Sequence, residues 1–524
     1  MRINRMKINP ILLEIFKNRF SSISEEMGVT LIRTGFSPNI KERRDLSCGI
    51  FDSSGDMIAQ AAHIPVHLGS MPMSVKSAIE SGPWSEGDMV MLNDPFKGGT
   101  HLPDITLVAP VFTGEKTPSF FVANRAHHAD VGGMTSGSMP LSASIFQEGV
   151  IIPPLKIIEK GGVDRKLMSL LLNNVRTPVE REGDFAAQIM ANITGVRRMQ
   201  ELVNINGLET IVFYAGALMT YSEEITRTVI RNIPDGSYSF EDFMDDDGFE
   251  NKNIRIHVTA TIKGDEAVLD FTESDTQVPG CINAVRAITL SVVLYVFRSL
   301  LERDIPTNAG CMRPVRVITR KGSVVDAEFP AAVAGGNVEM SQRIADVVLG
   351  SLAKAMPDII PAASQGTMNN VTIGGIDPRN NNPFAYYETI GGGMGATGRR
   401  DGESAVHSHM TNTLNTPAEA LEYAYPFMVT EYSIRQNTGG KGAHRGGNGI
   451  VREIQLLSDA EVTVLSERRT TAPYGLEGGG PGVAGKNIII VKGKKEEKPG
   501  KFTVTLNKGD ILRIETPGGG GFGE

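Results

Sequence analysis

The sequence predicts an α+β fold, namely a mixed multi-domain chain with antiparallel and mixed sheets, a helical middle segment and glycine-rich loops. Apolar residues recur at helical spacing near the N-terminus and in the middle of the chain, whereas other stretches alternate apolar and polar residues as strands do. Glycine makes up 58 of the 524 residues and is clustered, which indicates loops because glycine destabilises helix and strand interiors. With 40% apolar and 21% charged residues, the chain can form large cores in more than one domain.

The first region, residues 1–163, is expected to combine helices and strands. Its opening helix starts at Asn9-Pro10, a capping asparagine followed by proline at the first helical position, and apolar residues recur at helical spacing as far as Gly35. Alternating, β-rich runs separated by short turns predict two hairpins further along. In chain order, the later elements expected are a hairpin over residues 42–60, a helix over 70–81, a buried strand over 88–92 and a hairpin over 105–123.

Three more regions are expected after this one. Residues 164–235 have a helical pattern and should supply core rather than chemistry, residues 236–366 mix strands and helices, and residues 367–524 combine short strands with glycine loops. The elements expected in the third region are strands over residues 237–241, 253–262 and 267–271 and helices over 287–301 and 341–355.

Charge and cysteine content exclude several classes of protein. The formal net charge is -8 and the chain has no long basic run, which argues against nucleic acid as a partner. No apolar run is long enough to span a bilayer, which argues against a membrane protein. Cys48, Cys281 and Cys311 are scattered without metal-ligand spacing and are too few for a disulfide framework. We therefore expect a cytoplasmic protein.

The strongest candidate for a functional site lies in residues 93–130, which contain three of the nine histidines, several carboxylates and a Gly-Gly pair. Pro103 stands between His101 and Asp104, so this pair lies on an extended or turning segment where both side chains can converge. The hairpin that follows returns the chain to His127-His128. Imidazole and carboxylate together suit Zn²⁺, Mn²⁺ or Fe²⁺. The pattern therefore predicts a divalent metal site.

Two choices of ligand stay open at this site. Adjacent residues of an extended chain face opposite sides, so one of His127 and His128 should join the metal, and we favour His127. A fourth ligand would be Asp45 or Glu42, because a carboxylate can complete a histidine-containing site and still leave positions for water. The competing interpretation is that the first histidine and carboxylate cap a turn and that the histidine pair is a polar strand end.

Other histidines receive smaller roles. His63 and His67 are four residues apart, but Pro65 between them disfavours a helix, so we expect them to line a pocket. The His-Ser-His segment at residues 407–409 follows a long polar, glycine-rich stretch and resembles an active-site or partner-facing loop. The glycine clusters lack the Walker and Rossmann forms, which argues against a nucleotide site on this chain.

Four motifs point to a known family. They are residues 42–52 (ERRDLSCGIFD), 93–104 (NDPFKGGTHLPD), 127–133 (HHADVGG) and 516–521 (TPGGGG). Together they resemble the hydantoinase B family, which also includes the B-like half of 5-oxoprolinase, caprolactamase and the α-type subunits of acetone and acetophenone carboxylases. The similarity runs essentially from end to end.

The resemblance implies a function in two steps. Members of the family work with a hydantoinase A-type ATPase, which phosphorylates the carbonyl of a lactam or hydantoin, and the B-type chain then opens the ring at a divalent metal. This chain would thus be the metal-dependent subunit of an ATP-dependent hydrolase of a hydantoin, 5-oxoproline or lactam, in a hetero-oligomer whose partner uses the ATP. The alternatives are an α-type subunit of a ketone carboxylase, which tends to be longer, and a non-catalytic scaffold for the ATPase.

The resemblance also implies roles for individual residues. The metal set would be Asp45, His101, Asp104 and His127, with Glu42 and His128 as alternatives. Asp94 or Asp130 would orient a ligand histidine or take a proton from water. His128, when it is not a ligand, would support a ligand or contact the substrate.

Overall fold

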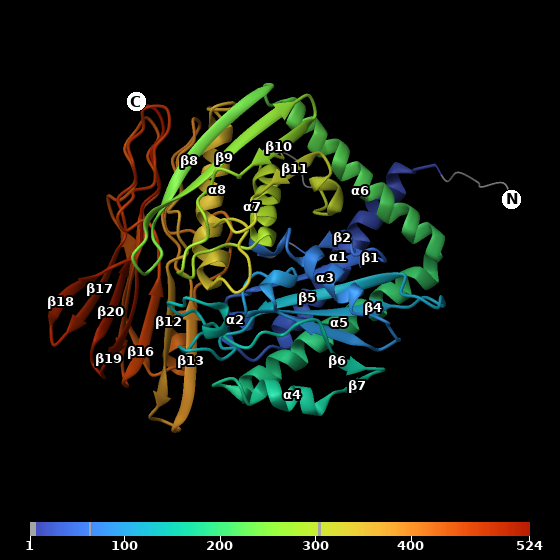
Figure 1. Ribbon diagram of the computed structural model, residues 1–524, viewed down its shortest axis with the longest axis horizontal. Helices are drawn as coiled ribbons and strands as arrows, with labels where there is room; N and C mark the ends of the chain where they lie inside the picture. Colours follow the sequence, from blue (N-terminus) through green and yellow to red (C-terminus); the bar gives the residue numbers. More distant parts are fainter. Residues whose placement is uncertain (1–6, 62–63, 302–304) are drawn as a thin grey trace.

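The computed structural model describes residues 7–61, 64–301 and 305–524, so His63 lies outside the described residues. Figure 1 shows most elements of residues 7–235 on the right and the strands of the last third on the left, with helices α7 (Arg286–Ser299) and α8 (Ser341–Ala353) between them. The combination of helices with several antiparallel or mixed sheets confirms the predicted α+β class. The boundaries of the four expected regions stay a prediction.

A seven-stranded antiparallel sheet organises the first part of the chain. In sheet order its strands are β2 (Met57–Gln60), β1 (Leu46–Asp52), β5 (Phe120–His127), β4 (Asp104–Val111), β3 (Met89–Leu92), β6 (Leu155–Glu159) and β7 (Gly162–Val163). The two expected hairpins, β1 with β2 and β4 with β5, are confirmed. β6 and β7 were not expected, because several of their residues are exposed and they show no clear apolar alternation.

Helices cover both faces of this sheet. α1 (Pro10–Thr34) begins as predicted, with the Asn9 side chain capping its first turn, and it packs beside α5 (Pro178–Asn206) on one face. α3 (Met71–Glu80) packs on the other face, where Val75 and Ala78 meet Val108 and Phe121. The sheet is therefore buried on both sides, which explains why its central strands carry apolar residues almost throughout.

Successive side chains of strand β5 point to opposite faces of the sheet, and this separates the two neighbouring histidines at its end. Asn124 donates a hydrogen bond to the backbone carbonyl of Gln188 on α5. Its neighbour Arg125 points the other way and donates to the hydroxyl of Ser74 on α3. Even-numbered residues of β5 thus face α5, and odd-numbered residues face α3 and the loops around it.

The helical pattern of residues 164–235 is confirmed by α4 (Arg165–Leu172), α5 and α6 (Leu208–Arg231). Gly207, at φ 82°, separates α5 from α6. Among the described residues no single helix has the length and apolar composition to cross a membrane, and α5 and α6 meet that test only as a pair bent by 110°.

A second sheet, in the order β11-β10-β9-β8, packs against α8. Its strands are β8 (Gly236–Asp246), β9 (Lys252–Lys263), β10 (Glu266–Asp270) and β11 (Val315–Ile318). The four-residue β11 pairs parallel to β10 and was not expected. α8 is buried along its whole length and follows a π-helical turn, Gly336–Met340, which carries Asn337 toward the first sheet.

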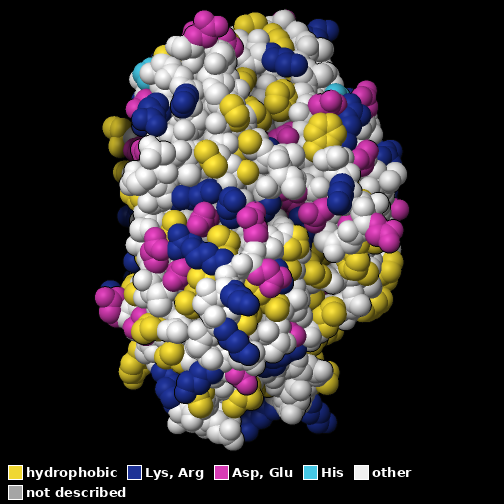
Figure 2. Space-filling view, turned by 90° about the vertical axis from the view of Figure 1, so that its left-hand side faces the viewer, with side chains coloured by type: hydrophobic (Ala, Val, Ile, Leu, Met, Phe, Trp, Pro, Cys, Tyr) yellow, Lys and Arg dark blue, Asp and Glu magenta, His cyan; other side chains and the backbone are white. Residues whose placement is uncertain are grey.

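The last third of the chain forms two antiparallel sheets with their own hydrophobic core. One consists of β13 (Asn382–Glu388), β12 (Asn370–Asp377), β16 (Ala460–Leu465) and β19 (Lys501–Leu506), and the other of β14 (Phe427–Arg435), β15 (Gly449–Leu456), β20 (Ile511–Glu515), β17 (Lys486–Val491) and β18 (Lys494–Lys498). Figure 2 shows the face on this side of the molecule, where acidic and basic side chains are interspersed. The two short α-helices are α2 (Pro38–Lys41) and α9 (Ala418–Ala424).

Candidate metal centre

The β4–β5 hairpin places a carboxylate opposite an imidazole. Asp104 is the first residue of β4 and His127 the last of β5, and the two are direct partners in the antiparallel register. The turn before β4 brings in His101. This turn needs glycine at Gly98, because its φ is 91° and a Cβ would lie 2.4 Å from a backbone carbon of Met73.

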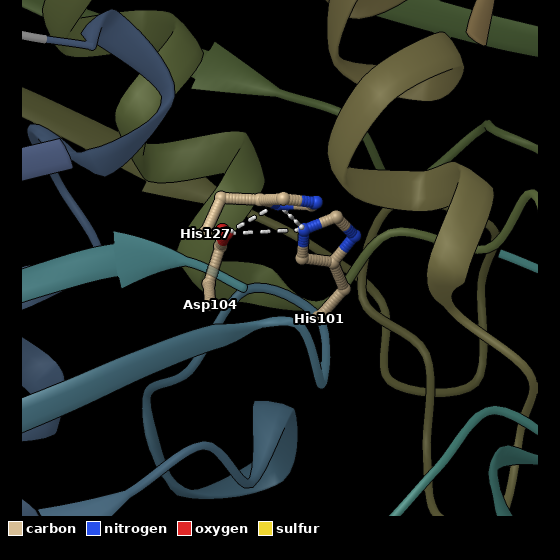
Figure 3. Close-up of side chains that lie close together, drawn as sticks. All are labelled: His101, Asp104 and His127. Carbon is tan, nitrogen blue, oxygen red and sulfur yellow. Dashed lines mark hydrogen bonds and ion pairs between the residues drawn. The ribbon is translucent and has the colours of Figure 1, made fainter. Parts of the chain in front are cut away.

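Three donor atoms of these residues converge on one point (Figure 3). His101 Nε2 lies 3.2 Å from Asp104 Oδ1 and 3.2 Å from His127 Nδ1. His127 Nδ1 lies 2.9 Å from the same Asp104 oxygen. Donors bound to one ion at about 2.1 Å and at right angles would be about 3.0 Å apart. The spacing therefore fits three ligands on one face of a metal ion.

The hydrogen bonds around the cluster also fit a cation. His101 Nδ1 donates to the backbone carbonyl of Ala334 at 3.2 Å, so Nε2, which faces the cluster, carries the lone pair when the imidazole is neutral, as it is when a metal is bound. Asp104 Oδ2 accepts the hydroxyl of Thr100 at 2.6 Å, which leaves Oδ1 for the cluster. Two nitrogens and a carboxylate oxygen form the donor set that suits Fe²⁺, Mn²⁺ or Zn²⁺. The residues present therefore fit a divalent metal ion.

Burial and mutual charge set the protonation of the cluster. Burial raises the pKa of Asp104, but the neighbouring His101 and His67 outweigh it and hold the pKa well below its usual range. Burial lowers the pKa of His101, and Asp104 more than offsets this, so that it is raised. Burial lowers the pKa of His127, with a partial offset from Asp104. The carboxylate is therefore ionised and available to a cation near neutral pH.

The two candidates for a fourth ligand differ in position. Asp45 is 7% exposed and lines a cavity of about 20 Å³ together with His127, although its carboxylate is not among the three converging donors. Its backbone carbonyl accepts the N–H of His127 at 3.0 Å. Glu42 is exposed at the end of α2. Asp45 therefore belongs to the surroundings of the cluster, and the structure does not bring Glu42 to it.

His128 faces away from the cluster, as the alternation of β5 requires. Its Nε2 lies 3.0 Å from Gln188 Oε1, and its ring centroid is 4.9 Å from that of Phe185, both on α5. Burial, with a contribution from Arg181, lowers the pKa of His128 to about 4. The structure therefore packs His128 between the sheet and α5 and does not bring it to the cluster, and the role expected of it in catalysis stays a prediction.

Asp94 and Asp130 are also held elsewhere. Asp94 caps a short helical turn and accepts the N–H of Phe96 at 2.9 Å. Asp130 accepts from the guanidinium of Arg176 at 2.9 Å and from the N–H of Gly132 at 3.2 Å. Both carboxylates are engaged in local turns, so the structure does not bring them to the cluster in the roles expected of them.

Three residues around Asp104 were missed or underrated. His67, expected as a pocket-lining residue, lies with Nε2 3.2 Å from Asp104 Oδ2 and Nδ1 2.9 Å from the hydroxyl of Ser47. Asn337 Nδ2 lies 3.0 Å from His101 Nε2, and Thr100 donates to the same carboxylate. The Gly335-Gly336 pair before Asn337 is a signal that could have directed attention to it, because the pair allows a close approach of the backbone.

The buried side chain of Glu148 holds the backbone segment that hydrogen-bonds to His101. Glu148 Oε1 accepts the N–H groups of Val333 at 2.8 Å and Ala334 at 3.0 Å and the hydroxyl of Ser142 at 2.7 Å. These bonds fix the segment whose carbonyl holds His101. Burial raises the pKa of Glu148 to about 7.

The segment after residues 407–409 forms a wall of the same cavity. Met410, Thr411 and Thr413 line it opposite His127, together with Thr389. His409 lies with Nδ1 3.3 Å from the hydroxyl of Tyr295. This segment therefore lines the cavity beside the cluster with its threonines rather than with its histidines.

Comparison with known proteins agrees with the motifs. A family model described as hydantoinase B/oxoprolinase matches residues 9–524. The chain is 40% identical to a 5-oxoprolinase from Dictyostelium discoideum over 99% of its own length and 40% of the relative, so it spans about two fifths of that protein. It is 30% identical to a putative D-/L-hydantoinase subunit from Pseudomonas sp., covering 99% of this chain and 90% of that one.

A solved structure extends the agreement to the whole fold. The ATP-dependent caprolactamase from Pseudomonas jessenii superposes with a TM-score of 0.89 at 29% identity, covering 99% of this chain and 92% of that chain. The match of the family model to nearly the full length confirms the resemblance seen in the four motifs. The chain belongs to the hydantoinase B/oxoprolinase family.

Proposed function

We propose that this chain is the metal-dependent subunit of an ATP-dependent hydrolase of cyclic amides such as hydantoins, 5-oxoproline or lactams. The observation that carries the proposal is the convergence of His101 Nε2, Asp104 Oδ1 and His127 Nδ1 within 3.2 Å of one another in a buried site. The names of the relatives support the substrate class, since they include a 5-oxoprolinase, a hydantoinase subunit and a caprolactamase.

Each residue has a role in this proposal. His101, Asp104 and His127 would hold a divalent ion, and such an ion supplies Lewis-acid activation of water or a carbonyl. His67 and Thr100 hold Asp104 in place, and the carbonyl of Ala334 fixes the tautomer of His101. Asp45, which lines the cavity, would accept a proton at its carboxylate when water adds to the ring carbon that carries the phosphorylated oxygen.

Use of ATP is assigned to a partner of the hydantoinase A type. The chain spans about two fifths of a single-chain 5-oxoprolinase, so most of that relative lies outside the part that matches this chain. We place the phosphorylation of the ring carbonyl in the partner. The phosphorylated ring would then open at the group of His101, Asp104 and His127, which we call the metal cluster. The two chains would form a hetero-oligomer, in line with the word subunit in the name of the hydantoinase relative.

The test is co-purification with the hydantoinase A-type partner, followed by assays of ATP-dependent opening of 5-oxoproline, hydantoin and caprolactam, with metal analysis of the same sample. His101→Ala should remove the metal and ring opening while the partner still binds nucleotide. His444→Ala, a partly exposed histidine paired with Asp401 at 3.5 Å, is the matched control and should change neither. Unchanged turnover and metal content in His101→Ala would contradict the proposal.

The same assay separates the alternatives. A ketone carboxylase would consume bicarbonate and a ketone with ATP and would not open cyclic amides. A non-catalytic scaffold would hold no stoichiometric metal and would tolerate His101→Ala without loss of the complex's activity.

A further inference from the structure

Three threonine hydroxyls line the cavity beside the metal cluster. Thr389 follows β13, and Thr411 and Thr413 belong to the irregular segment after residues 407–409. Each is at most 4% exposed. Asp45 and His127 line the same cavity, so a group that reaches the cluster through this cavity also meets the threonines.

The three hydroxyls are linked to one another and to the guanidinium of Arg43. Arg43 Nη2 donates to Thr389 Oγ1 at 3.0 Å, and a guanidinium can only donate. Thr389 Oγ1 is 2.9 Å from Thr413 Oγ1, which is 3.2 Å from Thr411 Oγ1. Two hydrogen bonds join the three hydroxyls, and each uses one hydroxyl proton, whereas the bond from Arg43 uses a guanidinium proton. Three hydroxyl protons serve two bonds, so one of them is left and can be donated to an acceptor in the cavity.

The positive charge at the start of this chain is incompletely paired. Arg43 is fully buried, its nearest ion-pair partner among the described residues is Asp45 at 3.8 Å, and its Nε–H has no acceptor among them. Its other Nη donates to the backbone carbonyl of Tyr387 at 3.0 Å. A buried guanidinium is stabilised by a negative charge nearby, so an anionic group in the cavity would be favoured by Arg43 as well as by the hydroxyls.

We propose that Thr389, Thr411 and Thr413, backed by Arg43, form an oxyanion-binding subsite facing the His101–Asp104–His127 cluster. Its ligand is a phosphoryl oxygen of the activated ring carbonyl, and of phosphate once the ring has opened. This assignment rests on the proposed function, in which a phosphorylated substrate arrives from the partner. It also gives a role to the polar loop after residues 407–409.

The size of the cavity is consistent with a subsite for one oxygen atom. At about 20 Å³ it holds roughly one water-sized group. A whole phosphoryl group needs the wall formed by Met410, Thr411 and Thr413 to move outward. This wall has neither helix nor strand, and its backbone is held by few hydrogen bonds, among them Leu414 N–H to the carbonyl of Arg43 at 3.2 Å.

The test is calorimetric titration of inorganic phosphate into the purified chain without partner or cyclic amide. Thr411→Val and Thr413→Val keep the shape of the side chain and remove the hydroxyl, and each should weaken phosphate binding about 10-fold or more, because a hydrogen bond to a charged group is lost. Thr503→Val is the matched control, since its hydroxyl pairs with Thr463 at 3.0 Å in the C-terminal sheet, and it should bind phosphate as the unchanged chain does.

Thr411→Ser keeps the hydroxyl and should retain phosphate binding, which covers the case in which a valine variant does not fold. No binding of phosphate to the unchanged chain, equal affinity in folded Thr411→Val, or loss of binding in folded Thr411→Ser would overturn the subsite. Binding of bicarbonate in place of phosphate would overturn the phosphoryl assignment. Because ring opening is not part of the measurement, failure of the subsite is distinguishable from failure of the proposed hydrolase.

Discussion

In two buried polar clusters of this chain, the carboxylates have different kinds of ion-pair partner. At the metal cluster, the ion pairs of Asp104 among the described residues are all with histidines, His67, His101 and His127. Where α8 and β8 meet the C-terminal segment, Arg468 lies 2.7 Å from Asp346.

The second cluster, which we call the junction network, consists of Asp242, Asp246, Arg343, Asp346, Glu467, Arg468 and Lys501. Its carboxylates are paired with permanent cations, so the network is complete without a ligand. The carboxylate of the metal cluster is surrounded by side chains that can be neutral and that present lone pairs. The contrast supports a structural role for the junction network and is in line with the proposal that the metal cluster binds a cation.

The largest effect should come from breaking the metal cluster. Asp104→Asn keeps the shape of the side chain and removes its charge. It should lower kcat/KM for ring opening by roughly three powers of ten or more, because a bound metal supplies several kcal/mol of transition-state stabilisation. Assays with the partner and metal analysis check this. The matched change Asp346→Asn in the junction network should leave the metal content intact, and loss of metal there would contradict the contrast.

Breaking the junction network should act on stability instead. Arg468→Met removes the closer arginine from Asp346 and Asp242 and leaves them Arg343, at 3.8 and 3.6 Å. Removal of one partner of a buried pair costs about 3–5 kcal/mol of unfolding free energy. Urea denaturation measures this change. Lys486→Met, at a surface pair with Glu497, should change the unfolding free energy by less than about 1 kcal/mol. Equal effects of the two substitutions would show that the network is not structural.

Substitution of Glu148, which holds the backbone segment next to His101, should have an intermediate effect. Glu148→Ala releases the N–H groups of Val333 and Ala334 and should weaken metal binding about 10- to 100-fold. Glu148→Gln keeps an acceptor oxygen and should retain most of the affinity. Competition with a chelator measures both. An alanine variant that binds metal normally would exclude this positioning role.

The smallest effect should be a change in the pH dependence of the unfolding free energy when His128 is replaced. Its pKa is lowered to about 4 in the folded chain, against about 6.5 in an unfolded one. The unfolded chain therefore binds the additional proton, and the stability contribution present above pH 6.5 is lost as pH falls toward 4. His128→Gln should reduce the slope of unfolding free energy against pH in that interval, by at most about 1.4 kcal/mol per pH unit. An unchanged slope would argue against a buried, neutral His128.

Local sequence signals predicted the elements that carry the metal cluster. Asn9-Pro10 marked the start of α1, and the β4–β5 hairpin followed from two β-rich runs and a turn. The alternation of side chains in a strand predicted that one of His127 and His128 faces the carboxylate, and in the structure this is the favoured His127.

The surroundings of the cluster could not be predicted in this way. Asn337 is 233 residues from Asp104 and Thr389 is 346 residues from Arg43, although each pair is in contact. Such contacts depend on how the sheets and α8 pack, and no local periodicity records that packing. The roles expected of Asp94 and Asp130 show the converse, since proximity in sequence to the histidines did not bring either carboxylate to them.

The most direct test of the metal cluster is metal analysis of the purified chain and of two neighbouring variants, His127→Ala and His128→Ala. We predict about one divalent ion per chain, loss of that ion in His127→Ala and its retention in His128→Ala. Retention of the ion in folded His127→Ala, or its loss in folded His128→Ala, would contradict the assignment of His101, Asp104 and His127 as the metal ligands.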